Sequence, residues 1–309
     1  MDPMAPMPPM APMDPMAPAE KGSHDILVAI QKALFTNTGL LVGRFGTIEF
    51  DVCWESENGY ITKDAAAVLE RNAGVFPSSI DSIQKWVSAT KEAFQGADIL
   101  ATGWYAPIIK REQTLLESWS YKGSHIVLRG LEPYYSYPEL RWTNALEGQK
   151  VCVVSSFTKT MATQLEKGEA CVWPETYGSI WPLYTKWSWV NTGYAPSMSL
   201  GRASWEDDPS SWEEAVAYVV GSVMNTGARI VLIGCGGLGM IIANELKKKG
   251  KICIVMGGAI QVLFGIKGGR WKNHGFISKL WNEEWVYPSV DETPGAAWAV
   301  ENSCYWAAK

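Results

Sequence analysis

The sequence RIVLIGCGGLGMIIANELKKKGKICIVMGGAIQVLFGIKGGRW, residues 229–271, predicts a strand, a glycine turn, a helix, a second strand and a second glycine turn. The first strand is expected over Ile230 to Ile233, because a short β-branched run of this kind is typically buried in a parallel sheet. The turn after it places Gly234, Gly236 and Gly239 at the spacing G-x-G-x-x-G. Such a turn points free backbone N–H groups and a helix dipole above the strand, which favours a phosphate.

The rest of this stretch argues against a redox dinucleotide. A helix is expected over Met240 to Lys249, since its closing lysines and Gly250 are typical of a helix C-terminus. The next strand, Ile252 to Met256, ends at Gly257-Gly258. A dinucleotide fold needs an Asp or Glu at this place to hold the ribose hydroxyls. A nucleotide or diphosphate site is therefore the first hypothesis, and an NAD(P)-dependent oxidoreductase is the alternative.

Composition indicates a globular protein and disfavours nucleic acid as a partner. Of the 309 residues, 47% are hydrophobic and 19% are charged, so the chain can bury a large core. The net charge of −5 has the wrong sign for neutralising the phosphates of a nucleic acid. The chain also has 16 Trp and 12 Tyr. Aromatic faces suit sugars and bases, with core or interface packing as the alternative.

Cysteine and histidine usage predicts a reduced, cytoplasmic protein without a zinc site. The six cysteines form no C-x-x-C pair, and several lie in apolar, strand-like runs, as reduced thiols do. The three histidines, His24, His125 and His274, lack the spacing of zinc ligands. The sequence shows neither an apolar run of about 18 residues nor a secretory signal, so we expect no membrane span.

Composition also divides the chain into two parts. Residues 1–20 are rich in Met and Pro and repeat the hexamer MDPMAP, which predicts a disordered or polyproline-like tail, with a docking peptide as the alternative. Over residues 21–309, predicted strands alternate with predicted helices. This alternation is typical of an α/β domain with a mainly parallel sheet. We therefore expect a single Rossmann-like domain there.

The strand Leu40 to Val42 leads into a second stretch rich in functional groups, Gly43-Arg44-Phe45-Gly46-Thr47-Ile48-Glu49-Phe50-Asp51. Its glycines allow the backbone to approach a ligand, and Arg44 is suited to clamping a phosphate or a carboxylate. Glu49 and Asp51 place two acids beside it. The alternative is a tight strand-to-helix turn held by an Arg–Glu ion pair.

Other predicted strands also end in polar, aromatic or basic turns. These turns lie at residues 102–107, which include Trp104 and Tyr105, at residues 155–160, and at residues 257–270. In a parallel sheet, ligands bind at the edge where the carboxyl ends of the strands meet. We therefore expect these turns to converge with the two glycine turns above. For residues 155–160, a serine acting as a helix N-cap is the alternative to a phosphate site.

Further expectations concern single segments. A helix is expected from a cap at Ser23 through Phe35, and another after the capping box Ser210-x-x-Glu213. Residues 171–205 hold five tryptophans among Pro, Gly and Thr. Long irregular segments of this kind are usually lids or binding loops, so we expect contact with the acceptor or substrate there.

Four segments together resemble the GT-D type of glycosyltransferase and its uncharacterised relatives. They are Gly43 to Glu49, Gly148 to Val154, Ile233 to Gly239, and Met256 to Trp271, which is the most specific of them. The resemblance spans about residues 25–285. It implies transfer of a sugar from a nucleotide diphosphate sugar, usually a UDP-sugar, within a Rossmann-like domain. Some members of this general type serve large viruses that glycosylate their capsids, which makes UDP-xylose an expected donor.

The resemblance also implies an Asp-x-Glu motif that helps to hold the donor diphosphate and a divalent metal, Mn²⁺ or Mg²⁺. The matching residues are Thr47-Ile48-Glu49, so the Glu is kept and the Asp is replaced. This replacement leaves metal dependence open, with Asp51 as a candidate substitute. It also makes a non-catalytic nucleotide-sugar binding protein a further alternative.

Chemistry and resemblance together give the candidate site. Glycosyl transfer needs cations or N–H groups on the leaving diphosphate and, for inversion, a carboxylate that deprotonates the acceptor hydroxyl. The candidate catalytic residues are Glu49, Asp51 and Asp207, with Asp208 in reserve, and Glu49 is also the candidate metal ligand. The candidate donor-binding residues are Gly43, Arg44, Gly46, Thr47, Ser155, Ser156, Thr158, Gly234, Gly236, Gly237, Gly239, Gly257, Gly258, Lys267 and Arg270. The candidate acceptor-binding residues are Trp104, Tyr105 and Trp181.

Two points about these candidates stay open. For Asp207, a structural role beside a helix N-terminus is the alternative to catalysis. The expected partners are a nucleotide sugar donor and a glycan acceptor, and a homodimer is compatible with the sequence.

Overall fold

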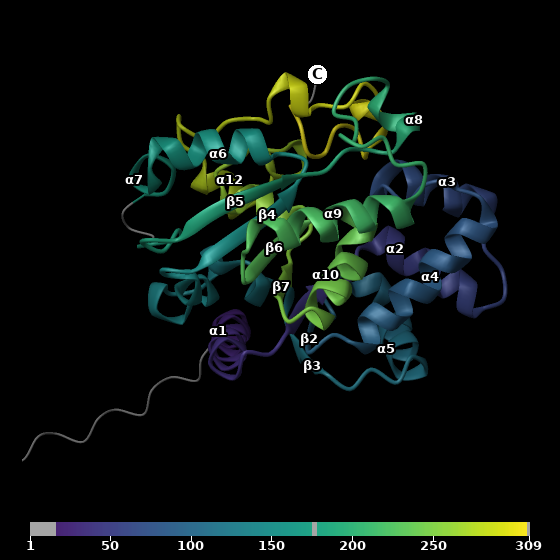
Figure 1. Cartoon of the computed structure of the whole chain (residues 1–309), viewed down its shortest axis with the longest axis horizontal. Coiled ribbons are helices and arrows are strands. Elements are labelled where there is room, and N and C mark those ends of the chain that lie inside the picture. The colour runs from purple at the N-terminus through teal and green to yellow at the C-terminus, as the bar shows by residue number, and fades with distance from the viewer. Residues whose placement is uncertain (1–16, 175–177, 308–309) are drawn as a thin grey trace, which may run out of the picture.

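The computed structural model describes residues 17–174 and 178–307 (Figure 1). Within these residues, seven parallel strands form one sheet in the order β3-β2-β1-β7-β6-β4-β5. The strands are β1 (Leu40–Arg44), β2 (Ile99–Ala101), β3 (Ser124–Ile126), β4 (Lys150–Ser155), β5 (Lys186–Asn191), β6 (Ile230–Gly234) and β7 (Ile252–Val255). The prediction of an α/β protein with a mainly parallel sheet is confirmed, and the arrangement is Rossmann-like.

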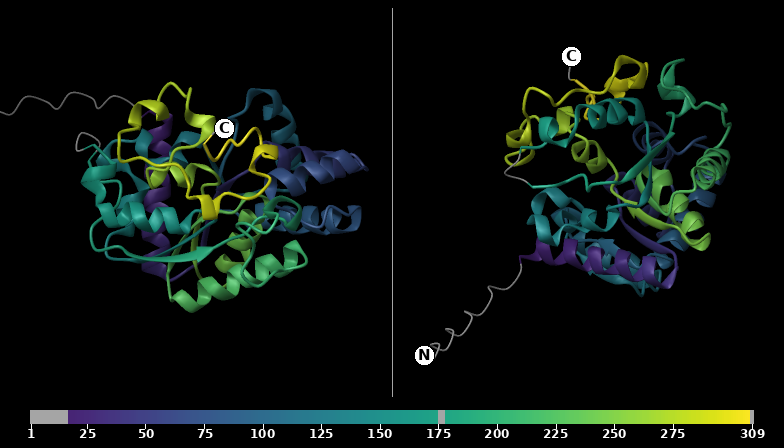
Figure 2. Two further views of the ribbon diagram at one scale, coloured as in Figure 1. Left: turned by 90° about the horizontal axis from the view of Figure 1, so that it is seen from above. Right: turned by 60° about the vertical axis from the view of Figure 1, so that its left-hand side comes forward.

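Helices connect the strands and pack on the sheet. They are α1 (Pro18–Thr36), α2 (Thr47–Glu57), α3 (Lys63–Ala73), α4 (Ile80–Gln95), α5 (Ile109–Ser118), α6 (Thr158–Lys167), α7 (Glu169–Val172), α8 (Pro196–Ser199), α9 (Trp212–Thr226), α10 (Gly239–Lys248), α11 (Ala259–Leu263) and α12 (Ile277–Leu280). Figure 1 shows α9 and α10 side by side. Helix α1 and the C-terminal segment lie on opposite sides of the molecule (Figures 1 and 2). Of the helices described, none has both the length and the apolar character that crossing a membrane requires.

The central strands hold the core together. Strands β1, β6 and β7 are buried over almost their whole length, because both faces of a parallel sheet are covered by helices. Each fully buried Val, Leu or Ile side chain contributes roughly 1.5–3 kcal/mol. The apolar runs predicted at residues 40–42 and 230–233 are therefore the strands on which the site is built.

The strand order places the G-x-G-x-x-G turn beside a crevice. The chain leaves β6 toward β7 and leaves β4 toward β5, which are opposite directions along the sheet. Right-handed crossovers send these two connections to opposite faces, so a crevice opens between the carboxyl ends of β4 and β6. The predicted glycine turn follows β6 and lies at this crevice.

The first helix begins earlier than expected. It starts at Pro18 rather than after Ser23, so residues 18–20 belong to the helix and not to the predicted tail. Proline is tolerated at the first helical position, and the Glu20 carboxylate accepts a hydrogen bond from the backbone N–H of Ala17 at 3.0 Å. Ser23 is buried inside the helix, where its Oγ accepts the N–H of Trp142 at 3.1 Å. Residues 1–16 of the predicted tail lie outside the described residues.

Residues 171–205 do not form one irregular lid. They contain the edge strand β5 and the short helices α7 and α8. Trp173 and Trp181 are buried, and both indole N–H groups donate to the carbonyl oxygen of Leu263, at 3.1 and 2.9 Å. Trp187 and Trp189 pack against Phe264. Most of these tryptophans therefore serve packing, which tertiary contacts decide and composition does not.

The N-cap of α9 lies one residue later than predicted. The N-cap is Ser211, whose Oγ accepts the N–H of Glu214 at 3.3 Å. Ser210 instead donates its backbone N–H and its hydroxyl to Oε2 of Glu214, at 2.7 and 2.9 Å. The predicted Glu213 is thus replaced by Glu214, because Ser210 and Ser211 are both suitable caps and the sequence does not choose between them.

Candidate functional site

Turns at the carboxyl edge of the sheet surround a cavity of about 460 Å³. Its wall includes residues that follow β1, β2, β4, β5, β6 and β7, together with parts of α3, α4 and the C-terminal segment. The convergence predicted for the polar and glycine-rich turns is confirmed. The cavity is the candidate site because it gathers these turns in one place.

Two guanidinium groups converge on the turn after β7. A Cβ atom placed on Gly257 would lie 3.4 Å from Nε and Nη2 of Arg44, and one placed on Gly258 would lie 3.4 Å from Nη1 of Arg270. Because these glycines are consecutive, both positive charges lie near the same turn. Gly257 has a left-handed φ of 59°, which glycine adopts without steric cost. This turn is suited to an anion such as a phosphate.

The C-terminal segment holds Arg270 in place. Its Nη2 lies 2.7 Å from Oε2 of Glu301 and 3.2 Å from Sγ of Cys304. Its guanidinium lies 4.4 Å from the centroid of the Tyr305 ring. Burial lowers the pKa of Arg270, but Tyr305, Cys304 and Glu301 together raise it above its ordinary value. Arg270 is therefore a permanent cation. A phosphate would compete with the Glu301 carboxylate for this guanidinium group.

Arg44 is positioned by the turn after β2. Its guanidinium lies 5.0 Å from the centroid of the Trp104 ring, which is a cation–π contact. The indole Nε1 of Trp104 is buried and lacks a hydrogen-bond partner within the described residues. Tyr105, next in the chain, is 44% exposed and lines the cavity. An aromatic wall thus stands beside Arg44, at the place predicted for the acceptor.

Glu49 lies in the first turn of α2, whose N-cap is Gly46. A Cβ atom on Gly46 would collide with the Glu49 carboxylate, so a glycine is needed to leave room for it. Burial raises the pKa of Glu49 above its ordinary value, more strongly than its own backbone N–H, Arg44 and Arg270 lower it, and Glu301 adds to the rise. A carboxylate of raised pKa beside two arginines is suited to accepting a proton.

The G-x-G-x-x-G turn packs closely on α3. Gly236 has a left-handed φ of 45°, and a Cβ atom there would lie 2.5 Å from the carbonyl oxygen of Ala73. The carbonyl oxygen of Gly237 accepts the indole N–H of Trp86 at 2.8 Å. Gly239 instead faces Val255 and allows α10 to approach the sheet. The first part of the motif therefore lines the cavity, while its last glycine serves packing.

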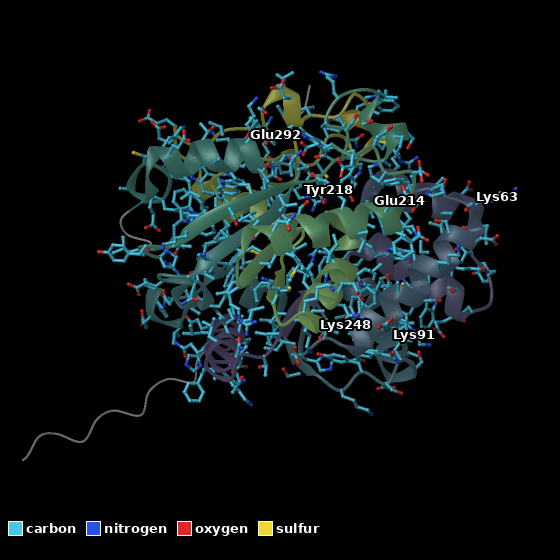
Figure 3. All side chains as sticks on the ribbon, in the orientation of Figure 1. Lys63, Lys91, Glu214, Tyr218, Lys248 and Glu292 are labelled. Carbon is cyan, nitrogen blue, oxygen red and sulfur yellow. The ribbon has the colours of Figure 1, made fainter. Side chains whose placement is uncertain are left out.

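The N-terminus of α6 is already occupied by a carboxylate of the protein. Glu292, labelled in Figure 3, is 5% exposed. Its Oε1 accepts the N–H groups of Lys159 and Thr160 at 2.8 and 3.1 Å. The Thr160 hydroxyl donates to Oε2 of the same residue. The Lys159 ammonium pairs with Asp291 at 2.8 Å. The N–H groups of Lys159 and Thr160 are therefore already paired with a carboxylate of the protein.

The two serines before α6 do line the cavity. Neither serine is the N-cap of the helix. That position is Phe157, whose side chain makes no capping hydrogen bond. The Ser155 Oγ accepts the N–H of Phe157 at 3.2 Å, and the Ser156 hydroxyl lies 2.7 Å from the hydroxyl of Tyr194. The N-cap alternative for these serines is therefore wrong.

The structure brings most of the predicted site residues to the cavity. Those that line it are Arg44, Gly46, Thr47, Glu49, Trp104, Tyr105, Ser155, Ser156, Gly234, Gly236, Gly237, Gly257, Gly258 and Arg270. Those outside its wall are Gly43, Asp51, Thr158, Trp181, Asp207, Gly239 and Lys267.

The residues outside have contacts of their own. Asp51 lies 3.4 Å from Nη1 of Arg111, and burial raises its pKa while Arg111 lowers it. The Thr158 hydroxyl donates to Oδ1 of Asn191 at 3.1 Å. The Lys267 ammonium lies 5.8 Å from the centroid of the Trp281 ring.

The other residues outside the cavity wall either serve packing or lie in a separate turn. A Cβ atom on Gly43 would collide with Sδ of Met240, so the glycine makes room for that side chain. Asp207 and Asp208 lie in the turn before α9, with Glu206 accepting the hydroxyl of Tyr218 at 3.0 Å.

Sequence reasoning missed part of the cavity wall. The missed residues include Arg71, Asn72, Glu301, Tyr305 and Trp306. Thr192, Tyr194 and Trp205 also line the cavity and lie in residues 171–205, where contact with the acceptor or substrate is expected. The triplet Thr192-Gly193-Tyr194 follows strand β5 and could have been found had that strand been recognised. No local pattern marks residues 301–306, since their place depends on long-range hydrogen bonds to Gly269 and Arg270.

The donor set around Glu49 does not fit a divalent metal held by the protein alone. Glu49 and Glu301 each lie near a guanidinium group, and Thr47 replaces the second carboxylate of the expected motif. Over residues 17–174 and 178–307, there is no group of three or more His, Cys, Asp or Glu side chains arranged to hold a metal. Hard divalent cations prefer several oxygen ligands.

Comparison of the chain with models of known protein families, with curated proteins and with solved structures gave no match.

Proposed function

We propose that the protein is a glycosyltransferase that uses a nucleotide diphosphate sugar as donor. The observation that carries the proposal is the pair Arg44 and Arg270 on either side of Gly257-Gly258, with the carboxylate of Glu49 beside them. This arrangement has the charges that a leaving diphosphate and an attacking hydroxyl require. The resemblance to GT-D glycosyltransferases supports the same function.

Each group has a definite task in this proposal. Arg44 and Arg270 neutralise the charge that grows on the leaving diphosphate as the bond from the sugar to the phosphate breaks. Glu49 takes the proton from the acceptor hydroxyl as its oxygen bonds to the anomeric carbon, which gives inversion. Trp104 and Tyr105 offer aromatic faces to the acceptor glycan. The proposed compartment is the cytoplasm, since all six cysteines are free.

The experiment is a ligand panel followed by an activity assay. Thermal melting is measured with UDP, GDP, CDP, UDP-xylose, other UDP-sugars and NAD(H), each with and without Mn²⁺. We expect a nucleoside diphosphate or its sugar to raise the melting temperature, because a ligand that binds only the folded state stabilises it. Donor turnover with acceptor glycans is then followed by release of the nucleotide. Stabilisation by NAD(H) alone, or by no nucleotide, would refute the proposal.

A further inference from the structure

Two buried polar atoms without partners belong to residues of the cavity wall. They are Oδ1 of Asn72 and Nε1 of Trp205, both buried and without a hydrogen-bond partner in the described part of the chain. Both residues line the cavity, and Trp205 is only 7% exposed. A buried donor or acceptor is unfavourable unless something pairs with it, so these atoms indicate groups of a ligand.

The wall around these atoms is built by α3 and the segment after β5. Asn72 precedes Ala73, which contacts the glycine turn after β6. Trp205 packs with its backbone on Gly193, where any Cβ atom would collide with it. The hydroxyl of Ser197 joins the two parts by donating to Oε1 of Glu70 at 2.5 Å. The wall is therefore a connected structure rather than a loose surface.

The strand order gives the cavity a direction. Glu49 follows β1, the two arginines meet at the turn after β7, and the unpaired atoms lie by β6 and β5. Adjacent strands are about 4.8 Å apart, so β1 and β5 are separated by roughly 19 Å. A phosphate at the β7 turn therefore has Glu49 on one side and the unpaired atoms on the other.

From this order we propose that Asn72 and Trp205, with Arg71, form a subsite for the nucleoside half of a nucleoside diphosphate. The assignment rests on the proposed function, because Glu49 must lie at the anomeric carbon and the nucleoside must then extend toward β5. The indole N–H of Trp205 donates to an acceptor of the base. Asn72 Oδ1 accepts from an N–H of the base or from a ribose hydroxyl.

Arg71 completes the subsite at its mouth. It is exposed, lines the cavity beside Asn72, and is thus free to lay its guanidinium on the face of a base. The nucleoside would lie between this cation and the turn after β6, with its phosphates directed to Arg44 and Arg270.

The test compares the binding of UDP with the binding of inorganic pyrophosphate, which has no nucleoside. Isothermal titration calorimetry is performed on the wild type, Asn72→Leu and Trp205→Phe, with circular dichroism to confirm folding. Each variant should weaken UDP binding about 3- to 10-fold, the effect of one hydrogen bond, and leave the Kd of pyrophosphate unchanged. Trp298→Phe is the control, because Trp298 is 72% exposed and outside the cavity wall; it should change neither Kd.

Trp104 supplies a matched variant for the opposite orientation. Its Nε1 is also buried and unpaired, but it lies at the β1 and β2 end of the cavity. If the nucleoside lay there, Trp104→Phe and not Trp205→Phe would weaken UDP binding while leaving the Kd of pyrophosphate unchanged. That result would overturn the proposal. Equal weakening of both ligands by the two subsite variants, or no effect on UDP, would also overturn it.

The subsite and the transferase proposal fail separately. A protein that binds UDP with the expected pattern but transfers no sugar supports the subsite and refutes the transferase. A wild type that binds pyrophosphate but not UDP overturns the subsite, whatever the reaction proves to be.

Discussion

At the residue scale, two carboxylates compete for two guanidinium groups. Glu301 pairs directly with Arg270 at 2.7 Å, whereas Glu49 interacts with both Arg44 and Arg270 without a direct ion pair to either in the described contacts. Burial keeps the pKa of Glu49 raised although two cations lie near it. In the proposed reaction, Glu49 takes a proton and a phosphate displaces Glu301 from Arg270.

Replacing Glu49 should separate chemistry from binding. Glu49→Gln removes the proposed base and keeps the shape of the side chain. We expect kcat/KM to fall by about 10²- to 10⁴-fold with little change in the Kd of UDP. Asp51→Asn is the matched control, because Asp51 lies outside the cavity wall and should leave the rate nearly unchanged. A large loss of kcat/KM in Asp51→Asn, with none in Glu49→Gln, would make Asp51 the base instead of Glu49.

The raised pKa of Glu49 predicts the acidic limb of the pH–rate profile. Only the deprotonated carboxylate can accept a proton, so kcat/KM should fall as the pH drops through this pKa. Because the pKa is raised, the limb should lie above 4.5, the ordinary value of the carboxyl. The measurement is kcat/KM against pH for the wild type and for Glu49→Gln, whose residual rate should lack this limb. A limb that persists in the variant would assign it to another group.

Glu301 should act as a competitor of phosphate. Glu301→Gln removes the negative charge from Arg270 and should lower the Kd of pyrophosphate about 2- to 5-fold, a small effect because both side chains are partly exposed. Calorimetric titration at low salt measures it, and added salt should reduce the difference. Weaker binding in the variant would mean that Glu301 positions Arg270 for the ligand instead of competing with it.

At the element scale, the glycine turn is where a dinucleotide turn would be. It follows β6, which borders the crevice and begins the run of strands that leads away from it. The next strand in that run, β7, ends at Gly257-Gly258 with two arginines instead of an acid. A turn common to many nucleotide-binding sheets is thus combined with a second glycine turn that lies beside two arginines.

The carboxylate at the start of α6 should matter for stability. Glu292→Gln keeps the size of the side chain but replaces the carboxylate that accepts the N–H groups of Lys159 and Thr160 with a neutral amide. We expect a loss of about 1–3 kcal/mol in the free energy of unfolding, because the site is buried. Asp291→Asn is the neighbouring control, since its ion pair with Lys159 is exposed and should contribute about 0–1 kcal/mol. Urea unfolding measures both, and equal effects would contradict the assignment.

At the scale of the whole molecule, the cavity depends on segments that are far apart in the chain. Residues after six strands and residues near 301–306 share one wall. The C-terminal segment packs on residues 269–270, where the N–H groups of Gly269 and Arg270 donate to the carbonyl oxygens of Trp306 and Cys304 at 3.1 and 3.0 Å. Binding in this cavity therefore engages most of the sheet.

A ligand in the cavity should accordingly protect distant segments together. With UDP bound, amide hydrogen exchange should slow at residues 44–49, 234–239, 257–270 and 300–306, because each lines or borders the same wall. Hydrogen-exchange mass spectrometry with and without UDP measures this, and α1, on the far side of the molecule, serves as the unchanged control. Protection restricted to one segment would indicate a different binding place.

The sequence by itself determined the class of the fold and part of the cavity wall. Apolar β-branched runs alternating with amphipathic helices define a parallel sheet, and such a sheet brings the turns after its strands to one edge. Arg44, Glu49 and the glycines after β6 and β7 were found in this way, because each directly follows a strand.

Only the tertiary structure decided which of these residues share the cavity and what completes it. Asp51 and Lys267 are close in sequence to cavity residues but outside its wall, and Glu292 occupies the N-terminus of α6. Trp205 and Glu301 arrive from distant segments. The physical reason is that strand endings are encoded locally, by residue pattern, whereas side-chain neighbours depend on long-range packing. The stretch from residue 229 to 271 therefore predicts an anion site, and the C-terminal return of the chain decides how that site is closed.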